Sequence, residues 1–211
     1  MNKFFSEYSG LYGIVDLSFK SIVDPILWTK EFVKYGIKII QLRAKYSSAA
    51  EIYNLAVEMR KVIPAESIFI VNDRPDIAYF SGADGVHLGQ DDIPPSVVKE
   101  KYPNMVIGYS THNEEQVIRA NFLDVDYIGF GPVYPTKSKE KPDPVVGVNL
   151  LQKVIGISNY PIVAIGGINK KNINNVLKPV KPKFYCIVSG LANSKQIGED
   201  IGYLQNLYKT L

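Results

Sequence analysis

Eight short apolar runs, each followed by a segment with helical character, predict an α/β protein built as a (β/α)₈ barrel. We expect strands at residues 11–15, 37–42, 68–71, 85–88, 106–109, 127–130, 162–165 and 184–188. Strands that alternate with helices pair in parallel through helical crossovers, and several of these runs are apolar nearly throughout, as expected for strands covered on both faces. Eight such units favour a closed barrel, although 211 residues is short for one. An open, doubly wound sheet is the alternative.

Three of the intervening segments carry clear helical patterns. The first has apolar residues at the i, i+3, i+4 and i+7 positions, namely Ile52, Leu55, Ala56 and Met59. A capping box from Ser48 to Glu51 is expected to open this helix. The second has the shorter stripe Ile173, Val176 and Leu177, and Asn169 is its expected N-cap. The last helix closes the chain with the stripe Ile197, Ile201, Leu204 and Tyr208.

Composition and charge exclude several classes of protein. With 46% hydrophobic and 21% charged residues, no linker and no low-complexity segment, residues 1–211 are expected to form a single domain. The net charge is only +3, and no basic run predicts nucleic-acid binding. No apolar stretch is long enough to cross a membrane, and the start is too soon charged for a signal peptide. The single cysteine, Cys186, fits a reducing compartment. We therefore expect a cytoplasmic protein and leave open whether it forms a homo-oligomer.

The chemistry of the chain is concentrated where the predicted strands end, which is where barrels of this kind build their active sites. Residues at these positions are Gln41, Arg43, Lys45, Asn72, Asp73, Gln90, Asp92, Ser110, His112, Thr136, Ser138, Lys139, Gly166, Gly167, Ser189 and Gly190. They supply cations, carboxylates, hydroxyl groups and glycines that expose the backbone. They include no evident pair of nucleophile and general base.

Asp73 and Asp92 each follow an apolar run, and the two runs lie about one strand–helix unit apart. If the runs are neighbouring parallel strands, both carboxylates emerge at the same end of the sheet. Two hard oxygen ligands from separate loops suit Mg²⁺ that bridges to a phosphorylated substrate. Each aspartate could instead be a helix N-cap, because prolines follow both. With Arg43 and Lys45 nearby, the metal site is the favoured interpretation.

Gln41, Arg43 and Lys45 alternate along the second strand, so their side chains share a face if the strand continues. Converging charge on that face suits a phosphate group. The alternative is a strand end with solvated cations.

Two other loops have a composition that suits anions. Residues 132–147 form the longest irregular stretch, and its hydroxyl and ammonium groups could close over a ligand and exclude water; these groups belong to Thr136, Lys137, Ser138 and Lys139. Gly166–Gly167 and Ser189–Gly190 follow the last two strands, where such barrels often bind phosphate. The alternatives are a charged surface loop and simple turn chemistry.

The two histidines and the cysteine are ambiguous. His112 could act as an acid–base group, although a structural role is commoner at such a position. His87 lies within the fourth strand and is expected to be buried and hydrogen-bonded rather than catalytic. Cys186 is expected to pack in the core.

These motifs, in this order, resemble the thiamine phosphate synthase family, whose members are also called thiamine-phosphate pyrophosphorylases. The resemblance covers residues 11–190, and its marks are the segments 41–45, 72–74, 83–92, 108–112, 131–136 and 164–168. It implies a TIM barrel that joins 4-amino-5-hydroxymethyl-2-methylpyrimidine diphosphate to the thiazole monophosphate. The products are thiamine monophosphate and pyrophosphate. Departure of pyrophosphate leaves a pyrimidine cation that the thiazole nitrogen attacks, so no protein nucleophile is needed.

The resemblance also implies roles for individual residues. The pyrimidine diphosphate is held by Gln41, Arg43, Lys45, Asn72, Ser110 and Lys139, and Asp73 and Asp92 carry Mg²⁺ on its pyrophosphate. The thiazole phosphate is held by Thr136, Ser138, Gly167, Val188 and Ser189. Arg43, Lys45, Ser110 and Lys139 are the expected catalytic residues, because they contact and neutralise the leaving group.

Two departures from the family pattern affect these expectations. Ala44 stands where many relatives have an acidic residue, and we expect its side chain to point away from the site. Residues 181–186 replace a small, glycine-rich segment, which bears on the shape of the thiazole-phosphate pocket.

Two other functions compete with the synthase. A thiazole tautomerase of the same superfamily shares the barrel and the histidine after Ser110 but needs no pyrophosphate–metal site, so Asp92 argues against it. A barrel that only binds thiamine precursors is the other alternative, and the retained cations and carboxylates argue against it.

Overall fold

The computed structural model describes residues 3–136 and 143–211, and within these ranges the sheet has nine strands, all of them parallel. The strands are β1 (Gly10–Leu11), β2 (Gly13–Asp16), β3 (Ile39–Arg43), β4 (Ile68–Asn72), β5 (Gly85–Leu88), β6 (Val106–Thr111), β7 (Tyr127–Phe130), β8 (Ile162–Ala164) and β9 (Phe184–Tyr185). Their spatial order is β1-β9-β8-β7-β6-β5-β4-β3-β2.

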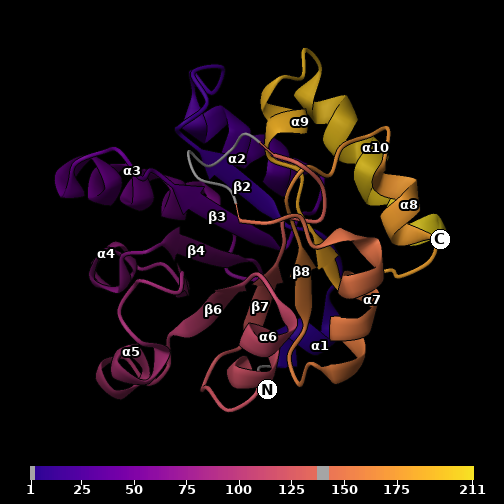
Figure 1. The fold of residues 1–211 in the computed structure, drawn as a ribbon. Coiled ribbons are helices and arrows are strands. Elements are labelled where there is room, and N and C mark those ends of the chain that lie inside the picture. The colour runs from indigo at the N-terminus through magenta and orange to yellow at the C-terminus, as the bar shows by residue number, and fades with distance from the viewer. Residues whose placement is uncertain (1–2, 137–142) are drawn as a thin grey trace.

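The sheet closes on itself because β1 and β2 are two parts of one barrel strand. Only Tyr12 separates them, and its N–H donates to the carbonyl of Tyr185 at 2.9 Å. On one side β1 pairs with β9, and on the other side β2 pairs with β3. The strands therefore form an eight-stranded closed barrel, seen as the central ring in Figure 1. The predicted (β/α)₈ barrel is confirmed, and the open sheet is wrong.

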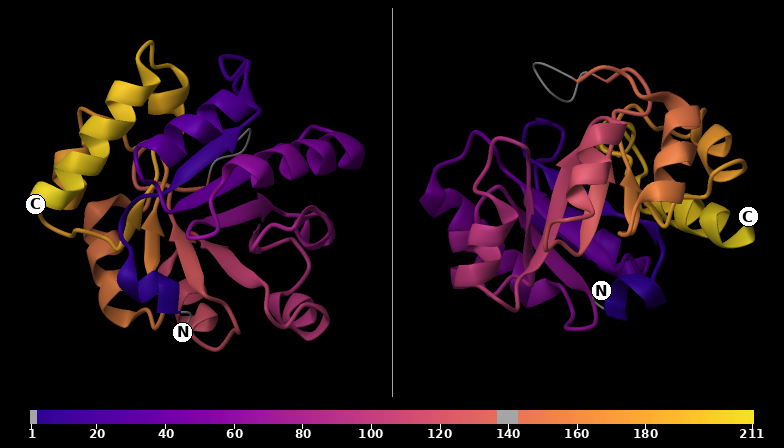
Figure 2. Two further views of the ribbon diagram at one scale, coloured as in Figure 1. Left: turned by 180° about the vertical axis from the view of Figure 1, so that it is seen from behind. Right: turned by 60° about the horizontal axis from the view of Figure 1, so that its bottom comes forward.

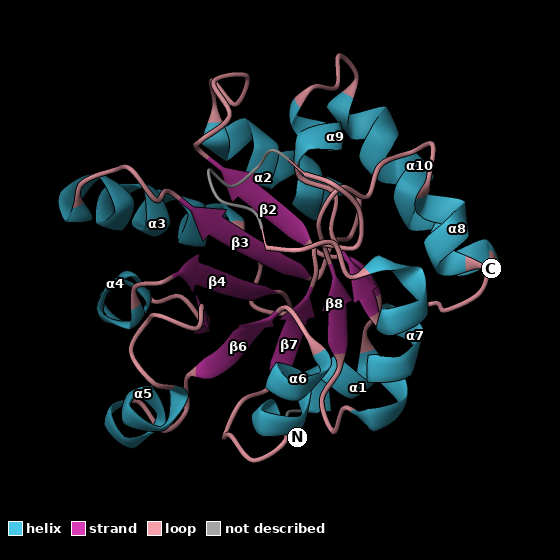
Figure 3. Cartoon of the chain, in the orientation of Figure 1, coloured by secondary structure: helices cyan, strands magenta, loops and turns pink. Residues whose placement is uncertain are grey.

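Helices surround this ring (Figure 3). They are α1 (Lys3–Glu7), α2 (Pro25–Lys34), α3 (Ala49–Val62), α4 (Pro75–Ser81), α5 (Pro95–Lys101), α6 (Glu114–Ala120), α7 (Gly147–Ile157), α8 (Ile173–Leu177), α9 (Ser189–Ala192) and α10 (Ile197–Thr210). The capping box is present at α3, where Ser48 and Glu51 bond reciprocally. The predicted stripes of α8 and α10 face the core: Ile173, Val176, Leu177, Ile201, Leu204 and Tyr208 are buried, and Ile197 is partly buried against them.

The predicted cap of α8 is wrong. Asn172, not Asn169, is the N-cap residue, and its side chain does not cap the helix. The Asn169 amide instead donates to the carbonyl of Gly167 at 3.1 Å, and its carbonyl oxygen accepts from the N–H of Lys171. The chain makes one extra turn before the helix begins, which a stripe of apolar residues does not reveal.

Side chains alternate between two cores, one inside the barrel and one between the barrel and its helices. Along β3, Ile39 belongs to the inner core, whereas Ile40 and Leu42 belong to the outer one. Ala44 continues the outward series and is buried in the outer core, so it points away from the barrel interior as expected.

Helix α1 covers the amino-terminal end of the barrel. Phe5 is fully buried in the inner core, where its ring stacks on Tyr127 at 5.0 Å and meets Phe184 edge-on at 6.1 Å. Residues 131–136, which follow β7, lie at the opposite end of the molecule (Figure 2). The barrel interior is therefore filled by apolar side chains at its amino-terminal end, beneath α1.

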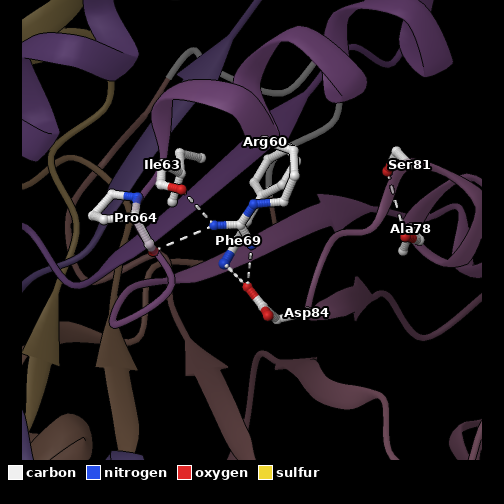
Figure 4. Close-up of polar contacts among 7 residues, drawn as sticks. All are labelled: Arg60, Ile63, Pro64, Phe69, Ala78, Ser81 and Asp84. Carbon is white, nitrogen blue, oxygen red and sulfur yellow. Dashed lines mark hydrogen bonds and ion pairs between the residues drawn. The ribbon is translucent and has the colours of Figure 1, made fainter.

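At the amino-terminal end, Asp84 joins two strands to a helix (Figure 4). Its N–H donates to the carbonyl of Phe69 at 2.9 Å, and its carboxylate accepts from the N–H of Phe69 at 2.7 Å. The same carboxylate accepts from Arg60 of α3 at 2.8 Å, and Arg60 also donates to the carbonyl of Ile63. Asp84 belongs to a motif of the family resemblance, but its contacts are structural.

Asp126 repeats this arrangement two strands further on. Its N–H donates to the carbonyl of Ile107 at 2.7 Å, and its carboxylate accepts from the N–H of the same residue at 2.9 Å. Lys99 of α5 supplies the cation, 3.9 Å away. Both aspartates precede a strand and fix its start against the neighbouring strand.

Candidate active site

A cavity of about 740 Å³ opens at the carboxyl ends of the strands. Of the residues predicted to form the site, it is lined by Gln41, Arg43, Lys45, Asn72, Asp73, Asp92, Ser110, Thr136, Gly167, Val188 and Ser189. Gln90, His112 and Gly166 also line it. Ser138 and Lys139, like Lys137, lie outside the described residues. A second hollow, of about 600 Å³, lies at the amino-terminal end beside Phe4, and it contains none of the predicted site residues.

Asp73 and Asp92 meet on one wall of this cavity. Asp73 follows β4 directly and has a φ of 62°, in the left-handed region that aspartate tolerates better than most residues. Its N–H donates to the carbonyl of His87 at 2.9 Å, which fixes it beside β5. The Asp92 carboxylate accepts from the N–H of Gly89 at 2.6 Å within its own loop. The two side chains therefore converge from separate loops, as the sequence predicted.

The electrostatics of this pair are those of two crowded acids. Burial, the charge of Asp92 and a hydrogen bond with Asp92 together raise the pKa of Asp73 from 3.8 to about 6, with burial the largest cause. Lys45 and Arg43 oppose this increase. The N-cap alternative is wrong for both aspartates, because the N-cap residue of α4 is Arg74 and that of α5 is Pro94.

The donor set suits a hard divalent cation that keeps other ligands. Within residues 3–136 and 143–211, no three His, Cys, Asp or Glu side chains are grouped so that they could hold a metal. Mg²⁺ is commonly bound through one or two carboxylates, with waters and substrate phosphates completing its octahedron. Asp73 and Asp92 fit that pattern and do not fit a site made wholly of protein ligands.

Arg43 is fixed by a residue that the sequence analysis missed. Its Nη1 donates to both carboxylate oxygens of Asp16, at 3.1 and 3.0 Å, and Asp16 is only 2% exposed. The register of β2 against β3 places these two residues side by side. Arg43 is therefore no solvated strand end, because its side chain is 17% exposed and held in place. Lys45 lies at the exposed mouth of the same wall.

A chain of five polar side chains crosses the bottom of the cavity. Gln41 Nε2 donates to the hydroxyl of Tyr12 at 3.2 Å, and that hydroxyl lies 2.8 Å from the hydroxyl of Tyr127. The Tyr127 hydroxyl lies 3.0 Å from Nδ1 of His87, whose Nε2 lies 2.9 Å from Oγ of Ser110. Burial raises the pKa of both tyrosines, so they are neutral. His87 is hydrogen-bonded as expected, but it is only half-buried because it lines the cavity. The tyrosines were not predicted to be site residues.

His112 ties together the two ends of the segment that follows β7. Its Nδ1–H donates to the carbonyl of Gly131 at 2.7 Å, and the Asp143 carboxylate lies 3.5 Å from the same nitrogen. Its backbone N–H donates to the side chain of Gln116 at 2.7 Å. These contacts fix the orientation of the ring through Nδ1, so Nε2 is the acceptor nitrogen of the neutral imidazole.

The glycines after β8 are required by close backbone contacts. Gly166 and Gly167 have φ values of 96° and 66°. A Cβ on Gly167 would lie 2.5 Å from the carbonyl oxygen of Pro135. The N–H of Tyr134 donates to the carbonyl of Gly166 at 2.9 Å. This packing places Thr136 and Gly167 on the same wall of the cavity.

The unusual approach to β9 lies mostly below the cavity. Phe184 belongs to the inner core, and the side chain of Tyr185 donates to the carbonyl of Leu204 on the helix side. Cys186 packs in the inner core as expected, and it alone of residues 181–186 lines the cavity. The large residues of this segment therefore do not line the cavity, and Cys186 is its one contribution to the cavity wall.

Comparisons with known proteins agree with this architecture. The sequence profile described as "Thiamine monophosphate synthase" matches residues 11–191. The chain belongs to the thiamine monophosphate synthase family. The thiamine-phosphate synthase of Persephonella marina is 42% identical over 200 residues, which cover 93% of this chain and 94% of that protein. The corresponding protein of Koribacter versatilis is 38% identical over 203 residues, covering 94% and 95%.

A solved structure gives the same result for the fold. Thiamine phosphate pyrophosphorylase from Pyrococcus furiosus superposes with a TM-score of 0.85 at 32% identity, over 95% of this chain and 96% of that one. The family resemblance inferred from the motifs is thereby confirmed. In the described ranges, no helix combines the length and apolar character that a membrane span requires.

Proposed function

We propose that the protein is a transferase that makes thiamine monophosphate. It condenses 4-amino-5-hydroxymethyl-2-methylpyrimidine diphosphate with thiazole phosphate and releases pyrophosphate. The observation that carries this proposal is the position of Asp73 and Asp92 on the same cavity wall as Arg43 and Lys45, with both cations close enough to lower the pKa of Asp73. Two carboxylates beside two cations on one wall would hold a metal ion and a polyanion next to each other.

Asp73 and Asp92 are the proposed ligands of Mg²⁺. When bound there, the ion would neutralise charge on the departing pyrophosphate. This role also explains why two acids lie together in a site that raises the pKa of Asp73. The crowding is unfavourable in the free protein and would be relieved by a cation.

The protein's own contribution is positioning and electrostatic stabilisation. Arg43, held by Asp16, presents its remaining donors to the diphosphate without having to reorganise during the reaction. Lys45 adds a second charge at the mouth, and Gln41, Asn72 and Ser110 fix the rest of the pyrimidine substrate. Lys139 is proposed to join them from outside the described residues. No group need attack carbon, because the aminopyrimidine ring stabilises the cation that pyrophosphate leaves behind.

The thiazole phosphate is proposed to bind on the side of the cavity opposite the carboxylates. Thr136, Gly167 and Val188 come from the loops after β7, β8 and β9, and Ser189 begins α9. All four line that side. Ser138 would complete the group. Holding both substrates in one cavity converts an encounter of two molecules into a step within one complex.

The test is an assay for thiamine monophosphate and pyrophosphate with both precursors supplied. Both products should form in equal amounts, and omission of either precursor should stop thiamine monophosphate formation. A tautomerase would instead convert a thiazole carboxylate phosphate without any pyrimidine. A barrel that only binds precursors would show saturable binding and no product.

A further inference from the structure

The polar chain below the cavity has a direction, which can be derived from the Gln41 end. The Gln41 amide donates to the Tyr12 oxygen, so the single proton of Tyr12 is left to donate to Tyr127. Tyr127, which accepts that bond, donates its own proton to Nδ1 of His87. A neutral imidazole that accepts at Nδ1 carries its proton on Nε2. His87 therefore donates to Ser110 Oγ, and the Ser110 hydroxyl keeps its proton for the cavity.

The same direction follows independently from the Ser110 end. Ser110 lines the cavity in which a diphosphate is proposed to bind. Oxygen atoms of an ionised diphosphate accept hydrogen bonds and do not donate them. A serine that contacts them must donate its proton, and it can do so only if His87 supplies a donor rather than an acceptor to Oγ.

We propose that Tyr12, Tyr127 and His87 are positioning residues that hold the hydroxyl of Ser110 as a donor to the diphosphate of the pyrimidine substrate. This inference rests on the proposed function. The three residues do not touch the reacting atoms in this scheme. Because His87 donates to Ser110, the Ser110 hydroxyl does not have to donate its own hydrogen bond to His87.

Burial of the two tyrosines fixes the direction of these hydrogen bonds. Tyr12 and Tyr127 are 2% and 0% exposed, and no buried side-chain N or O atom in the described ranges lacks a hydrogen-bond partner. Reversing one bond would leave a buried donor or acceptor unpaired unless every bond reversed. The hydrogen bonds of the chain must therefore all point the same way, and no single bond can reverse by itself.

Glycine makes room for the central contact of the chain. A Cβ on Gly108 would lie 2.2 Å from Cζ of Tyr127 and 2.4 Å from Nδ1 of His87. Only a residue without a side chain at position 108 lets this hydroxyl and this nitrogen meet. The family resemblance marks Gly108 as part of a motif, and this contact gives a physical reason for it.

The tautomer of His87 is directly measurable, because the chain has only two histidines. Nitrogen-15 NMR of the ring nitrogens, recorded on the intact metal-free protein above the pH at which histidine is charged, separates the two tautomers. His112→Gln assigns the signals. We expect His87 to carry its proton on Nε2. A proton on Nδ1 in the wild-type protein would reverse the chain and overturn the proposal.

Tyr127→Phe tests whether the direction matters for turnover. It removes the donor to Nδ1, so the His87 tautomer should shift toward a proton on Nδ1. Turnover should fall by about 10- to 100-fold, the effect of one hydrogen bond to a charged group, with a smaller change in the KM for the thiazole phosphate. Tyr185→Phe is the matched control, since it removes a buried tyrosine bond to a carbonyl on the helix side.

The outcomes separate this proposal from the proposed function. Equal loss of turnover in Tyr127→Phe and Tyr185→Phe, at equal thermal stability, would contradict the positioning role. An unchanged His87 tautomer in Tyr127→Phe would contradict it as well. If the wild-type protein makes no thiamine monophosphate although His87 has the expected tautomer, the proposed function fails and the direction of the chain stands.

Discussion

The carboxyl group of Asp73 lies against that of Asp92, and this contact adds to burial in raising the pKa of Asp73 to about 6. Two acids brought together in this way cost stability whenever both are ionised. Carboxyl groups with a raised pKa in a cleft are typical of functional sites. It also makes the pair accessible to experiment without substrates.

Asp73→Asn should stabilise the metal-free protein at neutral pH. The folded-state pKa is raised, so the protonated form is favoured by folding, and the penalty is present above about pH 6 and lost as the pH falls toward the ordinary value of 3.8. The free energy of unfolding should rise by about 1–3 kcal/mol at pH 7.5 and change little at pH 4. Thermal unfolding at both pH values, without Mg²⁺, measures this.

Asp91→Asn is the control for that measurement, because Asp91 is exposed in the same loop as Asp92. It should show neither the gain nor its pH dependence. An Asp73→Asn protein that is less stable than wild type at pH 7.5 would mean that Asp73 is ionised at little cost.

Asp16→Asn should impair binding of the pyrimidine diphosphate through Arg43. Without the charge of Asp16, the guanidinium loses its fixed orientation, and kcat/KM for this substrate should fall by about 10-fold or more. Asp76→Asn breaks a different arginine–aspartate pair, with Arg74 at 2.6 Å, and should leave kinetics unchanged. Steady-state kinetics with each substrate varied in turn is the measurement. Equal behaviour of the two variants would show that Asp16 serves only the fold.

His112→Ala should leave the synthase reaction largely intact. Its Nδ1–H is bonded to the carbonyl of Gly131, and no step in the proposed reaction requires a protein base. Turnover should change by less than about 10-fold, with the same dependence on pH. Near-complete loss of turnover together with loss of one limb of the pH profile would favour acid–base catalysis.

Asp84→Asn should destabilise the barrel and leave both KM values unchanged. The carboxylate accepts from the N–H of Phe69 and from Arg60, and both bonds weaken when the charge is removed (Figure 4). Because the Asp84 side chain is 39% exposed, the loss should be only about 1 kcal/mol in the free energy of unfolding. Chemical denaturation gives the value. Lys61→Ala, which breaks an exposed pair with Glu58, should cost less.

The sequence predicts most of this fold because the barrel depends on local patterns. Each strand is a short apolar run and most of the predicted site residues follow the end of such a run, so the sequence alone predicts that Asp73 and Asp92 lie together. The helix boundaries were predictable where a cap has its own signature, as at Ser48. Asn169 was placed wrongly because asparagine also closes turns, and here it does so one turn before the helix.

The residues that escaped prediction depend on register between distant strands. Asp16 faces Arg43 only because β2 pairs with β3 in one register. Tyr12 and Tyr127 are 115 positions apart and resemble ordinary core aromatics in the sequence. Their hydroxyls meet because closure of the barrel brings β7 across from β1 and β2. A pattern within one segment contains no information about such contacts.

The most direct test of the account compares pyrophosphate release by the wild-type protein, Asp92→Asn and Asp91→Asn over a range of Mg²⁺ concentrations. With both precursors present, wild type and Asp91→Asn should release pyrophosphate in a Mg²⁺-dependent manner. Asp92→Asn should be slower by about 1,000-fold, as expected for loss of several kcal/mol of metal stabilisation, while circular dichroism shows a folded barrel. Full, Mg²⁺-dependent release by Asp92→Asn would contradict the claim that these two carboxylates hold the ion.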